Sequence, residues 1–94
     1  MKQPSILSSQ IFSMHLTHYY VYCLRHNVTN EIRYIGKTID LVQTKNRHFQ
    51  ISEQYNLSLQ IVAECYGDNL ASFIESHLIL ELSKTTVLMN KKIG

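Results

Sequence analysis

The chain has 94 residues, of which 45% are hydrophobic and 17% are charged, and its formal net charge is +2. This length suffices for one domain with a modest core and excludes two, and the apolar and charged fractions argue against an intrinsically disordered chain. The small net charge does not identify a partner by itself. No stretch approaches the ~18 apolar residues of a membrane span, and residues 1–14 lack a signal-peptide pattern, so we expect a cytoplasmic protein, neither secreted nor membrane-bound.

The N-terminal stretch differs from the rest of the chain. Residues 1–17 mix serine, glutamine and one proline with apolar residues that follow no clear period. We therefore expect an N-terminal extension of unknown role, followed by a single domain over residues 18–94.

Two tyrosine-rich stretches predict a β-hairpin. Residues 18–25 and 31–37 are rich in aromatic and β-branched side chains, which fit a pleated, half-buried surface, and turn-type residues separate them. Four of the six tyrosines of the chain lie here: Tyr19, Tyr20, Tyr22 and Tyr34. A tyrosine offers a ring to the core and a hydroxyl to a site.

A helix is predicted over residues 41–51, with Thr38 or Asp40 as its N-cap. On a helical wheel Leu41, Val42 and Phe49 share one face. Thr44 and His48 lie one above the other on a flank of that face, and we expect this flank to face the hairpin.

The second half of the chain predicts one more strand and one more helix. Residues 52–58 are polar and are expected to be irregular or to form a short helical turn, while residues 59–66 read as a third strand. A helix over residues 70–84 would begin at Asp68 or Asn69 as N-cap. The order β-β-α-β-α predicts the α/β (α+β) class, with a small three-stranded, mainly antiparallel sheet flanked by helices.

The two cysteines, Cys23 and Cys65, both lie in strand-like runs. Neither stands in a metal-ligand spacing such as Cys-x-x-Cys. Buried free thiols are the expectation, although a disulfide between two strands of one sheet is geometrically feasible.

The hairpin carries a motif that resembles a known nuclease signature. Tyr34-Ile35-Gly36 matches the second half of the GIY-YIG signature, and residues 18–20 stand in place of Gly-Ile-Tyr, with Tyr20 as the shared tyrosine. Glu75 and Asn90 stand at about the separations that this family gives to a helical glutamate and to an asparagine near the domain end. The resemblance covers residues 17–90 and implies a GIY-YIG-like fold.

The resemblance also implies an activity and assigns roles to residues. It implies a Mg²⁺-dependent (or Mn²⁺-dependent) endonuclease that hydrolyses DNA phosphodiester bonds, found wherever its nucleic acid resides. Tyr20 would help to activate the attacking water, Tyr34 would orient the water or the phosphate, and Glu75 would hold the metal. Gly36 and Asn90 would support the site structurally. Taken without the resemblance, a carboxylate such as Glu75 is as readily explained by an ion pair with a basic neighbour.

The chain departs from the family pattern at the catalytic arginine, because Thr44 occupies that position. A threonine cannot supply the positive charge of an arginine. Arg47 lies one helical turn later, and its long side chain leans toward the helix N-terminus, so it is the expected substitute. His48 matches a histidine often found in the family and would share proton transfer or contact phosphate, unless it only makes a structural hydrogen bond.

Basic residues gather around the motif. Arg33, Lys37, Lys45 and Arg47 are the expected nucleic-acid-binding residues, and DNA (or another nucleic acid) is the expected partner. A homodimer, a partner protein or a short recognition site would have to supply specificity. The alternative is a catalytically weak or inactive GIY-YIG-like domain that acts as a nucleic-acid-binding or protein-interaction module. A third hypothesis is an interaction domain whose tyrosines only fill the core.

Overall fold

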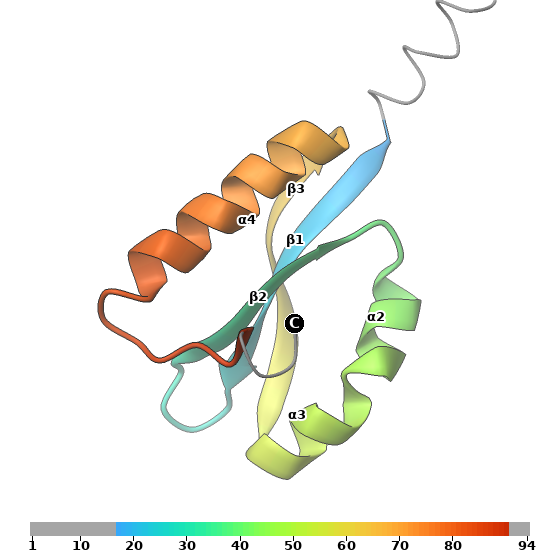
Figure 1. Ribbon diagram of the computed structural model, residues 1–94. Coiled ribbons are helices and arrows are strands. Elements are labelled where there is room, and N and C mark those ends of the chain that lie inside the picture. Colours follow the sequence, from blue (N-terminus) through green and yellow to red (C-terminus); the bar gives the residue numbers. More distant parts are fainter. Residues whose placement is uncertain (1–16, 91–94) are drawn as a thin grey trace, which may run out of the picture.

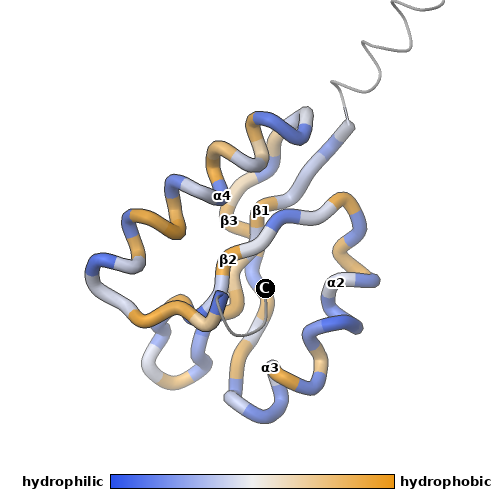
Figure 2. The backbone as a smooth tube through the Cα atoms, in the orientation of Figure 1, coloured by the Kyte–Doolittle hydropathy of each residue, from blue (hydrophilic) through white to orange (hydrophobic). Residues whose placement is uncertain are grey.

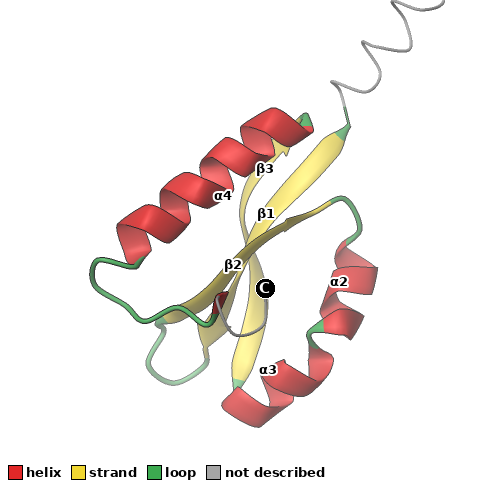
Figure 3. Ribbon diagram, viewed as in Figure 1, coloured by secondary structure: helices red, strands yellow, loops and turns green. Residues whose placement is uncertain are grey.

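The computed structural model describes residues 17–90, so the extension expected over residues 1–17 lies almost entirely outside the described part. The elements follow in the order β1 (His18–His26), β2 (Ile32–Thr38), α2 (Leu41–Arg47), α3 (Phe49–Tyr55), β3 (Leu57–Tyr66) and α4 (Asp68–Leu82). Helices and strands are distinguished by colour in Figure 3.

The three strands form one antiparallel sheet in the order β2-β1-β3. The expected α+β class and three-stranded antiparallel sheet are therefore confirmed, and all three strands begin and end within two residues of the predicted bounds. The predicted hairpin between β1 and β2 closes where the His26 amide donates to the Glu31 carbonyl at 2.8 Å. Asn30 takes the left-handed backbone conformation that this turn requires (φ 67°).

The sheet lies between two helical layers, with α4 on one face and the α2–α3 pair on the other (Figure 1). Side chains alternate along the strands: Val21, Cys23 and Ile35 pack against α4. Tyr22 and Tyr34 belong to a second group of buried side chains, which Ile51 of α3 joins. Each face of the sheet thus has its own core. Figure 2 shows hydrophobic stretches along the strands and α4, whereas α2 and α3 carry longer hydrophilic stretches.

The predicted helix over residues 41–51 is two helices. The chain leaves α2 at His48, whose backbone angles (φ −94°, ψ 6°) are not helical, and α3 starts at the next residue. Residues 52–58, which were expected to be irregular or a short helical turn, instead complete α3 and begin β3. Asn56 separates these two elements with a left-handed backbone (φ 59°). The observed order is β-β-α-α-β-α.

The N-caps match the predictions in one helix of two. The Asp40 side chain accepts from the Gln43 amide at 3.0 Å and caps α2, as one of the two predicted candidates. The N-cap of α4 is Gly67, which offers no side chain, so the expectation of Asp68 or Asn69 at this position is wrong.

The side of α2–α3 that faces the sheet is the predicted polar flank. Val42 and Phe49, which share one face of the helical wheel with Leu41, are 72% and 61% exposed. Thr44 and His48 face the hairpin as predicted and are 1% and 7% exposed. This polar flank can lie against the sheet because strand side chains satisfy it: His48 bonds the Tyr22 hydroxyl of β1, and Thr44 bonds Thr38 of β2.

Both cysteines are buried free thiols, in agreement with the prediction. Among residues 17–90, no helix combines the length and the apolar character that crossing a bilayer would require.

Candidate functional site

Three side chains meet between the sheet and the α2–α3 pair: Tyr22, Tyr34 and His48, here called the Tyr/His cluster. The ring of His48 lies 5.7 Å from that of Tyr22 and 5.1 Å from that of Tyr34, and the two tyrosine rings are 6.1 Å apart, centroid to centroid. A hydrogen bond of 2.8 Å joins the Tyr22 hydroxyl to His48 Nε2. Two neighbouring strands supply the tyrosines, and the break between α2 and α3 supplies His48. A phenol and an imidazole thus come into direct contact.

The register of the hairpin explains why Tyr22 is in this position. Tyr22 lies opposite Gly36, and a Cβ on Gly36 would be 2.5 Å from both Cζ and the hydroxyl oxygen of Tyr22. Only a glycine leaves room for the ring to cross β2. Gly36 of the sequence motif therefore positions the hydroxyl of Tyr22.

Tyr20, the tyrosine chosen from the sequence, is not part of the cluster. The register places Tyr20 opposite Thr38, four positions along β2 from Tyr34, and its ring lies 4.5 Å from that of His18. The structure therefore does not bring Tyr20 and Tyr34 into one cleft, and Tyr22 takes that place. Counting outward from the hairpin turn would pair residue 22 with residue 35, and an irregularity between Leu24 and Arg25 shifts its partner to Gly36, so no local pattern in the sequence specifies this register.

The surroundings of the cluster keep both hydrogen-bonding partners neutral. Burial, reinforced by Tyr34, raises the pKa of Tyr22 to about 12, while Arg47 opposes this rise. Burial also lowers the pKa of His48, and the charge of Arg47 adds to this effect. At neutral pH the phenol therefore keeps its proton. The neutral imidazole carries its proton on Nδ1, so its Nε2 accepts a hydrogen bond from the Tyr22 hydroxyl.

Thr44, which stands where the resemblance places an arginine, is enclosed by the fold. Thr44 is 1% exposed, and its hydroxyl donates to Thr38 Oγ1 at 2.7 Å. It contributes no charge to the cluster. Arg47 is exposed at the end of α2, and its guanidinium is close enough to the Tyr22 hydroxyl to oppose the rise of the phenol's pKa.

Glu75 belongs to α4 and so to the helix on the other face of the sheet from the Tyr/His cluster (Figure 1). Burial raises its pKa, Lys37 lowers it, and Asp68 raises it further. Lys37 itself is hydrogen-bonded to Asp68 and to Ser72 Oγ. The predicted catalytic residues are therefore divided between two groups, on either side of the edge strand β2.

The resemblance implies Mg²⁺, and Glu75 could hold this ion only in an open site, in which water and substrate supply most of the ligands. Among residues 17–90, no group of three or more His, Cys, Asp or Glu side chains is placed to hold a metal. Mg²⁺ is often held by one or two carboxylates, several waters and substrate phosphates, and the half-buried Glu75 carboxylate meets this minimum. A bound metal would supply Lewis-acid stabilisation of a phosphate beside β2.

Asn90 lies against the outer edge of β2. Its Oδ1 accepts from the Ile35 amide at 3.1 Å, and its Nδ2 donates to the Ile35 carbonyl at 2.6 Å. Met89 adds a backbone hydrogen bond to the Arg33 carbonyl. These contacts satisfy the edge of the strand that carries the motif, and they tie the end of the described chain to it.

The four predicted nucleic-acid-binding residues also divide into two pairs. Arg33 bonds Glu31 at 3.1 Å, and Lys37 bonds Asp68. Lys45 and Arg47 are exposed on α2 and form no ion pair within the described part of the chain. The unneutralised positive charge of the predicted set is thus on α2, on the same side of the sheet as the Tyr/His cluster.

Comparisons with protein-family models, with curated proteins and with solved structures gave no match.

Proposed function

We propose that the chain is a Mg²⁺-dependent endonuclease with a GIY-YIG-like site, in which Tyr22 has the role that the sequence motif assigned to Tyr20. The observation that carries the proposal is the hydrogen bond between the Tyr22 hydroxyl and His48 Nε2, with Tyr34 packed against both rings. A phenol joined to a neutral imidazole is a proton relay.

In this proposal, Tyr22 accepts a proton from the attacking water while it passes its own proton to His48. A free phenolate is not required, which agrees with the raised pKa of Tyr22. Arg47 lies beside the same hydroxyl and supplies positive charge where negative charge grows on the phosphate. Glu75 would hold Mg²⁺ across the edge of β2, and Lys45 would contact the nucleic-acid backbone.

A second candidate is a nucleic-acid-binding domain without cleavage activity. Two observations favour it: Thr44 is buried and uncharged where the family has its arginine, and Glu75 lies on the helix across the sheet from Tyr22. In that case Lys45 and Arg47 bind the backbone, and the Tyr/His cluster serves only as core.

The experiment is a cleavage assay of supercoiled plasmid DNA by the full chain with Mg²⁺ or Mn²⁺. Tyr22→Phe and Arg47→Ala should each lower the rate by ~10²–10³-fold, as is typical for the loss of one group that acts in the transition state. Tyr20→Phe is the matched control, because it removes the same hydroxyl from the same face of β1, and it should cut at the wild-type rate. Glu75→Ala should abolish cleavage and leave DNA binding intact.

The proposal is overturned if Tyr20→Phe loses activity and Tyr22→Phe keeps it, with both variants folded by circular dichroism. A wild type that binds DNA and never cuts it would instead support the second candidate.

A further inference from the structure

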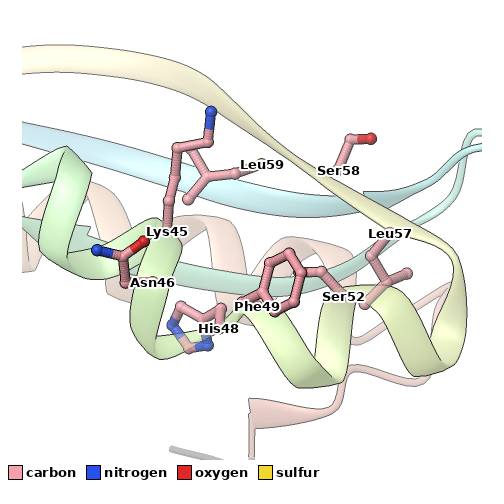
Figure 4. Close-up of a pocket in the computed structure, with 8 residues that line it drawn as sticks. All are labelled: Lys45, Asn46, His48, Phe49, Ser52, Leu57, Ser58 and Leu59. Carbon is pink, nitrogen blue, oxygen red and sulfur yellow. The ribbon is translucent and has the colours of Figure 1, made fainter.

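A pocket of about 320 Å³ lies beside the Tyr/His cluster, between the α2–α3 pair and the first residues of β3 (Figure 4). This volume is at the lower end of the ~300–1,000 Å³ that is usual for small-molecule sites. Of the residues that line it, the proposed function uses His48 and Lys45 and leaves the other six without a role.

The pocket, here called the β3 pocket, combines three kinds of group. Phe49 presents a ring that is 61% exposed, and Leu57 and Leu59 add an apolar wall. Asn46, Ser52 and Ser58 supply an amide and two hydroxyls, and Lys45 supplies a positive charge. Within the described part of the chain, no carboxylate lines the pocket. A flat apolar surface, hydrogen-bonding groups and one cation match the base, the base edge and the phosphate of a nucleotide.

The place of the pocket links it to the proposed chemistry. His48 lines the pocket and bonds Tyr22 through Nε2. A nucleotide in the pocket would therefore adjoin the phosphate that the Tyr/His cluster contacts. Lys45 lies on the same helix as Arg47, so the strand could pass from one cation to the other.

We propose that the β3 pocket binds an unpaired nucleobase next to the scissile phosphate, with the base stacked on Phe49. The inference rests on the proposed nucleic-acid substrate and specifies it: a strand with an unpaired nucleotide, such as a bulge, a flap or a single strand, instead of a continuous duplex. A paired base reaches such a pocket only after unstacking and unpairing, which costs a few kcal/mol.

The experiment measures binding in EDTA, so that no cleavage interferes. Fluorescence anisotropy gives the Kd of the full chain for a hairpin with one bulged adenine and for the same hairpin fully paired. The wild type should bind the bulged hairpin about tenfold more tightly, in line with the stacking energy of one base. Phe49→Ala should remove this difference, and Phe49→Trp should keep it.

Phe73→Ala is the matched control, because Phe73 is also exposed (68%) but lies on α4, on the other face of the sheet. It should bind both hairpins as the wild type does. Equal Kd values for the two hairpins, equal effects of Phe49→Ala and Phe73→Ala, or no binding at all would overturn the inference. Displacement of the bulged hairpin by free dAMP at micromolar concentration would also overturn it, by assigning the pocket to a free nucleotide.

Failure of this inference is distinguishable from failure of the proposed function. If the wild type cleaves DNA and Phe49→Ala does not change its preference, the inference fails and the endonuclease stands. If the wild type is inert with Mg²⁺ and Mn²⁺ but binds the bulge through Phe49, the pocket stands and the chain is a binding domain.

Discussion

The ring of Tyr22 crosses the backbone of Gly36, so closely that a Cβ at position 36 would lie 2.5 Å from the Tyr22 hydroxyl oxygen. The φ angle of Gly36 is not positive, so close approach is the reason for the glycine and backbone strain is not. The contact has two consequences, because it lets the ring lie across β2 and it brings the hydroxyl to His48.

Gly36→Ala is expected to lower the free energy of unfolding by about 1–3 kcal/mol, the usual cost of overpacking a core. Tyr22 is 1% exposed and cannot move aside cheaply. Urea unfolding followed by circular dichroism measures the change.

The control for this prediction is the same substitution in a Tyr22→Ala background. Without the ring, the added methyl group has room, so Gly36→Ala should cost little there. An equal cost in both backgrounds would show that Tyr22 is not the reason for the glycine.

The hairpin and the sheet could be predicted from the sequence because their signals are local. Runs of aromatic and β-branched residues indicate the strands, and the turn-type residues at positions 26–31 indicate the turn between the first two. The break at His48 could not be predicted, since it involves neither glycine nor proline and is stabilised by the long-range contact with Tyr22.

The candidate site could be predicted only in part. Tyr34, Gly36 and His48 follow from the motif and its spacing, and the structure brings them together. The first half of the motif indicates Tyr20, whereas the strand register places Tyr22 in the cluster. The division between Glu75 and the cluster depends on which face of the sheet α4 covers, and no local pattern specifies this.

The stability of the protein should depend on pH through His48. Burial lowers the pKa of the folded imidazole below the ordinary value of about 6.5, so the unfolded chain binds more protons there. The free energy of unfolding therefore falls as the pH is lowered from about 7 through about 6.5 toward the pKa of the folded state, and it is fully retained above about pH 7.

Urea midpoints of wild type and His48→Gln at a series of pH values test this. The chain has five histidines, and the other four are common to both proteins, so the difference between the two curves isolates His48. The wild type should lose more stability than the variant on acidification. Parallel curves would contradict the neutral, buried state of the imidazole.

The salt dependence of DNA binding should report two phosphate contacts instead of the four that the sequence suggests. Lys45 and Arg47 are exposed without an ion pair in residues 17–90, whereas Arg33 and Lys37 are bonded to Glu31 and Asp68. Each phosphate contact on a duplex contributes about −0.9 to the slope of log affinity against log salt, so we expect a slope of about −2.

Lys45→Gln with Arg47→Gln should bring the slope close to zero. The matched pair Arg33→Gln with Lys37→Gln removes the same charge from β2 and should leave the slope unchanged, since those cations already have carboxylate partners. A slope near −4 that falls equally in both double variants would mean that both ion pairs open on the nucleic acid and that β2 binds phosphate as strongly as α2.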